Sequence, residues 1–133
     1  MAEIRVPISP GELIDKLTIL EIKSERMTDP GKLANVRLEL ELLEDTWRAS
    51  DYGSADVATD RQAVKQINEK LWVIEDEIRD KERDQAFDAR FIELARAVYF
   101  TNDERARVKR RINDRLGSQI VEEKSYSDYT GAR

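Results

Sequence analysis

The chain has 133 residues and no cysteine or histidine, which excludes disulfides, thiol nucleophiles, Cys/His metal sites and His-dependent catalytic pairs. Its formal net charge of −5 argues against attraction of its whole surface to nucleic acid or anionic lipid. The length suits one domain, so we expect a single helical domain over 1–133. No apolar run is long enough to span a bilayer and no signal peptide is visible, so we expect a cytoplasmic protein without membrane insertion.

The two ends of the chain have no helical period. Apolar and polar residues alternate over EIRVPI, and Pro7 confines any strand there to an edge, so residues 1–8 are expected to form an extended arm. Residues 118–133 are expected to form an extended tail. The apolar pair at 120–121 is the one evident partner for the arm, and pairing of the two ends is a hypothesis.

Two consecutive segments carry the signals of a helix start. Ser9 can cap a helix that begins with Pro10 and extends to about residue 28, because proline suits the first helical position and a glutamate follows at the third. Asp29 can cap a second helix in the same way, over about 30–49.

Both of these helices carry apolar residues on a second face, opposite their main stripe. Ile19 and Ile22 lie there on the first helix, and Leu38 and Leu42 on the second. A single hairpin cannot cover both of these second faces, so later helices or another subunit must do so. We therefore interpret these four residues as a candidate interface, and expect a homo-oligomer, most simply a homodimer, or a protein partner.

The second half of the chain is also helical. A loop over 50–56 is followed by a long helix to about residue 84, and a change of apolar phase there precedes a helix over 87–100. A second capping box at Thr101 predicts the start of a short last helix, which Gly117 ends. The predicted fold is all-α, a compact bundle of four to five helices with short extended N- and C-terminal arms.

Carboxylates at the edges of the helical stripes form the first candidate site. Glu21 lies beside the stripe of the first helix, and Glu75 and Asp76 lie beside that of the long helix. Inward-facing carboxylates on two helices can hold Mg²⁺, because hard cations prefer oxygen ligands. The alternative interpretation is a solvated face with ordinary ion pairs, for which no cofactor is expected.

A basic stretch forms the second candidate site. Residues 105–115 carry six Lys or Arg side chains, whereas 75–84 is rich in acidic ones. This basic stretch can meet phosphates, and the alternative is a solvated face that balances the acidic stretch.

A further cluster, Tyr99, Asn102 and Asp103, lies at the predicted junction of two helices, where backbone N–H groups favour anions and where Arg96 and Lys109 can add positive charge. Arg96, Asn102 and Lys109 are therefore the candidate anion-binding residues, and the alternative is a capped corner with an aromatic plug.

Several segments resemble a family of small bacterial and phage proteins known only as a domain of unknown function. They are SPGELIDKLTILEIKSER, NEKLWVIEDEIRDKE, FIELARAVYFTND and GSQIVEEKSY, in that order over nearly the whole chain. The resemblance implies no activity. A site common to the family is expected to use Glu12, Lys16, Glu21, Glu75, Asp76, Arg96, Tyr99, Asn102, Asp103 and Lys109.

Two function classes follow from these observations. The leading hypothesis is a non-catalytic helical interaction or assembly module, homodimeric through the second apolar faces. The alternative is a Mg²⁺-dependent enzyme that acts on a phosphorylated or nucleotide-linked small molecule through helix-borne carboxylates. A chorismate-mutase-like site that uses Lys16, Arg37 and Arg96 has little support, and binding of RNA by the basic stretch is not expected.

Overall fold

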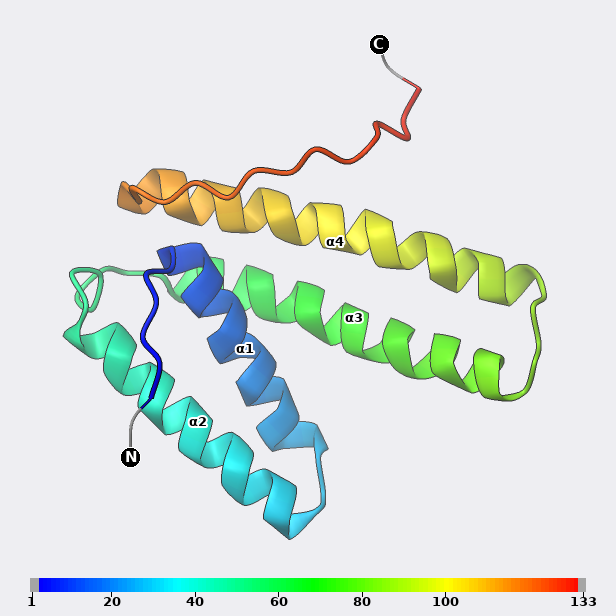
Figure 1. Ribbon diagram of the computed structural model, residues 1–133, viewed down its shortest axis with the longest axis horizontal. Coiled ribbons are helices and arrows are strands. Elements are labelled where there is room, and N and C mark those ends of the chain that lie inside the picture. The colour runs from blue at the N-terminus through cyan, green and yellow to red at the C-terminus, as the bar shows by residue number, and fades with distance from the viewer. Residues whose placement is uncertain (1–2, 132–133) are drawn as a thin grey trace.

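The computed structural model describes residues 3–131 and contains four helices in two hairpins (Figure 1). This confirms the all-α prediction with four helices, and the described residues include no strand. Helix α1 packs against each of the other three, while α2 packs on α1 and α3 on α4. The helices are α1 (Pro10–Arg26), α2 (Pro30–Ala49), α3 (Ala58–Arg83) and α4 (Ala89–Leu116).

The starts of α1 and α2 form as the sequence predicts. The Oγ of Ser9 accepts a hydrogen bond from the N–H of Glu12 at 3.2 Å, and Oδ2 of Asp29 accepts one from the N–H of Lys32 at 2.9 Å. Each cap gives a partner to one of the N–H groups that a first helical turn leaves free. Helix α1 ends at Arg26, two residues before the expected end.

The predicted break at Thr101 is wrong, since α4 continues through this position to Leu116. A capping box needs its glutamate to turn back to the cap, but the carboxylate of Glu104 lies 3.6 Å from Nζ of Lys70 on α3. Thr101 itself is buried. Helix α4 begins instead at Ala89, where Asp88 accepts a hydrogen bond from the N–H of Phe91 at 3.0 Å.

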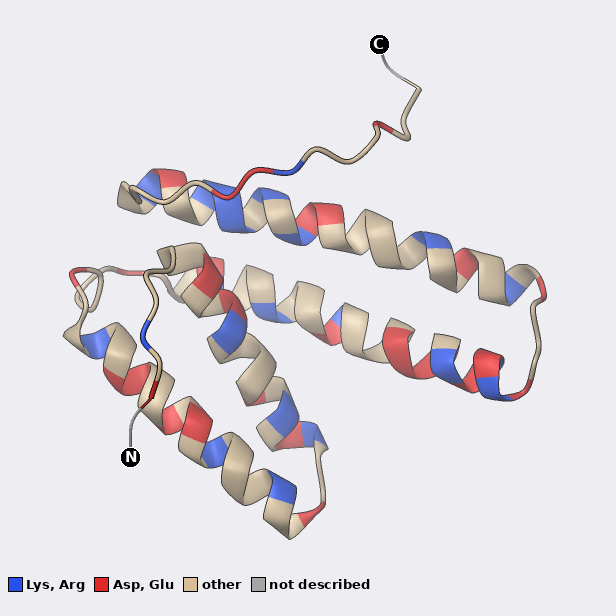
Figure 2. Ribbon diagram, viewed as in Figure 1, with Lys and Arg blue, Asp and Glu red and all other residues tan. Residues whose placement is uncertain are grey.

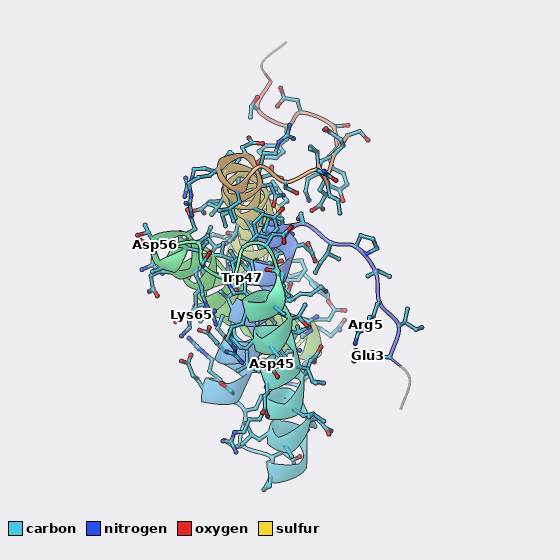
Figure 3. The ribbon with its side chains drawn as sticks, turned by 90° about the vertical axis from the view of Figure 1, so that its left-hand side faces the viewer. Glu3, Arg5, Asp45, Trp47, Asp56 and Lys65 are labelled. Carbon is cyan, nitrogen blue, oxygen red and sulfur yellow. The ribbon has the colours of Figure 1, made fainter. Side chains whose placement is uncertain are left out.

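The apolar core lies where α1 crosses α3 and α4. Leu17, Val64 and Ile112 are completely buried, one from each of these helices. Trp47 closes the core from α2, and the end-on view in Figure 3 shows it among the crossing helices. The C-terminal half of α3 and the N-terminal half of α4 extend beyond this core as a separate hairpin (Figure 1).

The predicted pairing of the two ends does not form. The described part of the arm, residues 3–8, is extended and stands away from the helices, with Ile4 93% exposed (Figure 3). The tail, described over 118–131, instead runs back along α4 (Figure 1), where charged and aromatic contacts hold it. Positions 1–2 and 132–133 of the predicted arm and tail lie outside the described residues. Over the described part of the chain, no helix is both long and apolar enough to cross a membrane.

Candidate functional site

The first turn of α1 meets the last third of α4 through polar contacts. The N–H of Gly11 donates a hydrogen bond to Oδ1 of Asn113 at 2.7 Å, in a buried position. One turn away, Nζ of Lys109 donates to the Glu12 carboxylate at 2.6 Å. Lys16 lies 3.7 Å from the other oxygen of Glu12. The two helices are thus joined by directional bonds, which fix their relative position more tightly than apolar packing alone.

A buried polar network continues from this junction into the middle of the molecule. Asn68 donates hydrogen bonds to Oδ1 of Asp15 at 2.8 Å and to Oγ1 of Thr18 at 3.0 Å. Its own Oδ1 accepts from Nη1 of Arg105 at 2.9 Å, and Nη2 of Arg105 donates to Asn102 at 2.9 Å. Among the described residues, no buried side-chain nitrogen or oxygen lacks a hydrogen-bond partner. The network is therefore fully satisfied and supports a rigid wall.

This wall borders a cavity of about 610 Å³ between α1, α4 and the tail, which we call the α1–α4 cleft. Four basic side chains of α4 line it and face two carboxylates of α1. Figure 2 shows the basic turns of α4 beside an acidic part of the tail. The side chains that line the cleft come from Glu12, Asp15, Asn102, Arg105, Ala106, Arg107, Lys109, Arg110, Asn113, Glu122, Glu123 and Lys124.

The tail contributes an acidic pair to the cleft. The carboxylate of Glu122 lies 3.6 Å from Nζ of Lys109, and that of Glu123 lies 3.9 Å from Nη1 of Arg110. Both glutamates are largely exposed, so these ion pairs are weak and sensitive to salt.

Electrostatics in the cleft depend on Lys109, whose Nζ also lies 3.4 Å from Asp15. Burial lowers the pKa of Lys109, but its hydrogen bond to Glu12 and the charges of Asp15, Glu12 and Glu122 outweigh burial, and the pKa is raised overall. Burial raises the pKa of Glu12, and the hydrogen bond and charge of Lys109 again reverse the sign, so the pKa is lowered. Both groups are therefore held in their charged forms.

A second hollow of about 450 Å³ lies on another side of the network, between α1 and the α3–α4 hairpin. Asn102 and Arg105 line both spaces. The second hollow is more apolar, and its other lining residues are Ile19, Ile22, Asn68, Leu71, Trp72, Glu75, Asp76 and Arg79.

The structure does not gather the residues predicted to hold a metal. Glu21 forms ion pairs with Arg61 and Lys65. Glu75 lines the second hollow and forms an ion pair with Arg79 on its own helix. Within residues 3–131, no group of three or more Asp and Glu side chains is placed to hold a metal ion.

Two of the three residues predicted to bind an anion come together. Asn102 and Lys109 both line the α1–α4 cleft. Arg96 is not among the residues that line it, and its guanidinium lies over the ring of Phe100, 5.5 Å from the centroid. The basic side chains of 105–115 do not act as one group. Nε of Arg115 donates to the buried Asp60 at 2.9 Å, whereas Arg107 and Arg111, earlier on the same helix, are exposed.

The four residues predicted to form an interface do not lie on one common surface. Ile22 is buried and Ile19 lines the second hollow, because α1 is covered by the later helices. Leu38 and Leu42 remain exposed on the outer face of α2, at 58% and 48%.

Two important members of the network, Asp15 and Asn68, were not predicted. A signal for Asn68 was present, since it lies four residues after Val64 and three before Leu71, on the apolar stripe of its helix. A polar residue in such a position has a buried partner more often than it faces solvent. The partner, Asp15, lies 53 positions earlier, and no local spacing links the two.

The fold and site define a small all-α protein with a charged cleft at a helix junction. A family model described as "Family of unknown function (DUF6165)" matches residues 4–132, and the chain belongs to this family. This confirms the resemblance to a domain of unknown function. Neither the curated proteins nor the solved structures contain a significant match to the chain.

Proposed function

We propose that this protein is a non-catalytic interaction module whose α1–α4 cleft recognises an extended, acidic polypeptide segment. The observation that carries the proposal is the place of the chain's own tail. Its acidic pair, Glu122 and Glu123, lies in extended chain against Lys109 and Arg110. A surface that receives this segment within the chain has the charge and shape to receive a similar one from a partner.

The composition of the cleft supports recognition. Arg107 and Arg110 are exposed, and they supply positive charge at the rim, where it steers an acidic partner. Beneath them, the bonds among Asp15, Asn68 and Arg105 hold the wall in one arrangement. Such prior order lowers the conformational entropy lost on binding.

The proposal is tested with a fluorescein-labelled synthetic peptide of residues 118–131 and a full-length chain that carries Glu122→Gln and Glu123→Gln. We expect saturable binding that weakens as salt is added, because the contacts at the rim are ionic. Adding Arg107→Gln and Arg110→Gln to the chain should weaken binding at least about tenfold. The matched control is Arg37→Gln with Arg111→Gln, which removes two exposed arginines that do not line the cleft. Equal loss of peptide affinity in both variants would show that only the net charge of the chain matters, and this result would contradict the proposal.

Self-association through α2 is a second candidate, favoured by one observation. Leu38 and Leu42 are four residues apart, so they form one exposed apolar strip on a helix that packs mainly on α1. A second copy that covers the same strip would give a symmetric interface. The placement of Glu21, Glu75 and Asp76 gives no comparable support to Mg²⁺-dependent chemistry.

A further inference from the structure

The tail makes a second contact with α4, separate from the acidic pair. The ring of Tyr129 lies 5.2 Å from the ring of Tyr99 and 5.0 Å from that of Phe100, edge-on to both. The carboxylate of Asp103 lies close enough to the hydroxyl group of Tyr129 to raise the pKa of that tyrosine. We call Tyr99, Phe100 and Asp103 the tyrosine seat.

The tyrosine seat lies on the outer side of α4. Tyr99 and Phe100 are each 41% exposed with the tail in place. Neither residue belongs to the buried core cluster, nor does any residue of the tail. The seat is therefore a surface feature that the four-helix core does not require.

The tail is long enough to make both contacts at once. Asp103 and Arg110 are two turns apart on α4, or about 10.5 Å along the axis. The six residues from Glu123 to Tyr129 can span up to about 20 Å when fully extended. The segment therefore reaches both points with slack to spare, and it runs in the direction opposite to that of α4 (Figure 1).

The reversal that sends the tail back along α4 is set at the end of the helix. Gly117 has a φ of 70°, and the next N–H, of Ser118, donates to the carbonyl oxygen of Asn113 at 2.9 Å. Glycine adopts this left-handed conformation at little cost. The chain thus delivers its own acidic pair and tyrosine to α4 at a high effective concentration.

We propose that the tyrosine seat is a second subsite of the proposed acidic-segment surface, and that it selects a tyrosine six residues after the acidic pair. The tail of the chain is the resident occupant of both subsites, and a partner segment of the same pattern must displace it. This inference rests on the proposed function and adds the aromatic requirement and the competition.

The chemistry of the seat favours tyrosine over other side chains. Two aromatic rings receive the ring of the ligand edge-on, an arrangement that adds to the gain from simple burial. The nearby carboxylate of Asp103 offers an acceptor to a tyrosine hydroxyl group, which phenylalanine lacks. A peptide with phenylalanine at this position should therefore bind less tightly than one with tyrosine.

The test compares the unaltered full-length chain with a full-length variant that carries Glu122→Gln, Glu123→Gln and Tyr129→Ala. The probe is the labelled peptide SQIVEEKSYSDYTG, and anisotropy gives its dissociation constant. We expect the variant to bind the probe at least about tenfold more tightly, because its own tail no longer competes. Circular dichroism and thermal melting of both chains establish that the fold is intact.

Altered probes separate the two subsites. On the variant chain, a probe with Tyr129→Ala should bind roughly five- to tenfold more weakly. The matched control is a probe with Tyr126→Ala, which removes a tyrosine that is 82% exposed in the chain and should bind as the original does.

Each outcome bears on one of the claims. Equal binding of the original and Tyr129→Ala probes would overturn the tyrosine subsite, while loss of binding with Gln at 122 and 123 of the probe would still uphold acidic recognition. Equal affinity of the two chains for the original probe would overturn the role of the tail as resident occupant. No saturable binding to the folded variant would overturn the proposed function together with the inference.

Discussion

Gly11 and Asn113 join the first turn of the first helix to the last turn of the fourth. The N–H of Gly11 donates to Oδ1 of Asn113 at 2.7 Å, and both residues are buried. A first helical turn leaves its N–H groups without intrahelical partners, so a side chain from another helix can bond there. The contact is close because glycine has no Cβ to separate the two helices.

Substitution of Gly11 by alanine should destabilise the protein by about 1–3 kcal/mol. An added Cβ would lie 2.7 Å from the carbonyl oxygen of Lys109 and 2.8 Å from Oδ1 of Asn113, and the first of these is backbone that cannot simply rotate away. Gly31→Ala is the control, since its Cβ would meet only a carboxylate oxygen of Asp29 at 3.4 Å. Chemical denaturation measures both. A Gly11→Ala protein as stable as the original would show that α1 and α4 can move apart freely.

Asn68→Leu should cost roughly 2–3 kcal/mol of stability, although leucine has a similar size. Asp15, Thr18 and Arg105 would each lose a hydrogen bond, and Thr18 is completely buried. A buried polar group that lacks its partner carries its full desolvation cost. The control, Gln66→Leu, lies on the exposed side of the same helix and should change stability by less than about 0.5 kcal/mol. Similar urea midpoints for the two variants would contradict the role of the network.

Features of the fold that depend on local sequence signals could largely be predicted. The caps at Ser9 and Asp29 and the exposed strip on α2 depend on local order along the chain, and all three are present in the structure. The break at Thr101 was also a local signal, but it failed because packing against α3 overrides a capping preference of about 1 kcal/mol. Local signals therefore hold where no distant helix competes with them.

The candidate site depends on contacts between distant segments. Lys109 was predicted as a site residue for its positive charge within the basic stretch, and Asn102 from a helix start at Thr101 that does not form. The partners of Lys109 come from α1 and from the tail, up to 97 positions away. Spacing along one helix carries no information about such contacts, so the sequence predicted two residues of the cleft without its shape.

Acid should weaken the protein partly through Glu12. Its pKa is lowered in the fold, so the stabilisation is present above the ordinary glutamate value of 4.5 and is lost as pH falls through the folded value. The raised pKa of Lys109 gives the opposite sign, with loss only as pH rises above 10.5. Urea midpoints measured over the acidic range should fall less steeply for Glu12→Gln than for the original chain.

Exposed ion pairs provide the control for this effect. Glu77 also has a lowered pKa, because Arg90 donates hydrogen bonds to it, but the pair is on the surface. High salt should remove the contribution of Glu77 and leave most of that of Glu12, whose partner Lys109 is mostly buried. An acid profile that Glu12→Gln leaves unchanged would show that this carboxylate is not held by Lys109 in solution.

Self-association should depend on the exposed strip of α2. Replacement of Leu38 and Leu42 by glutamate places charge where a second copy would pack, so a dimer of the original chain should become a monomer in sedimentation at about 100 µM. Both side chains are about half exposed or more, so the melting temperature at low concentration should stay close to that of the original. Gln62→Glu together with Gln66→Glu adds the same two charges, four residues apart, on the exposed side of α3 and should leave the dimer intact. If the original chain sediments as a monomer at this concentration, the strip is not a self-association surface and the α1–α4 cleft is left as the proposed binding surface.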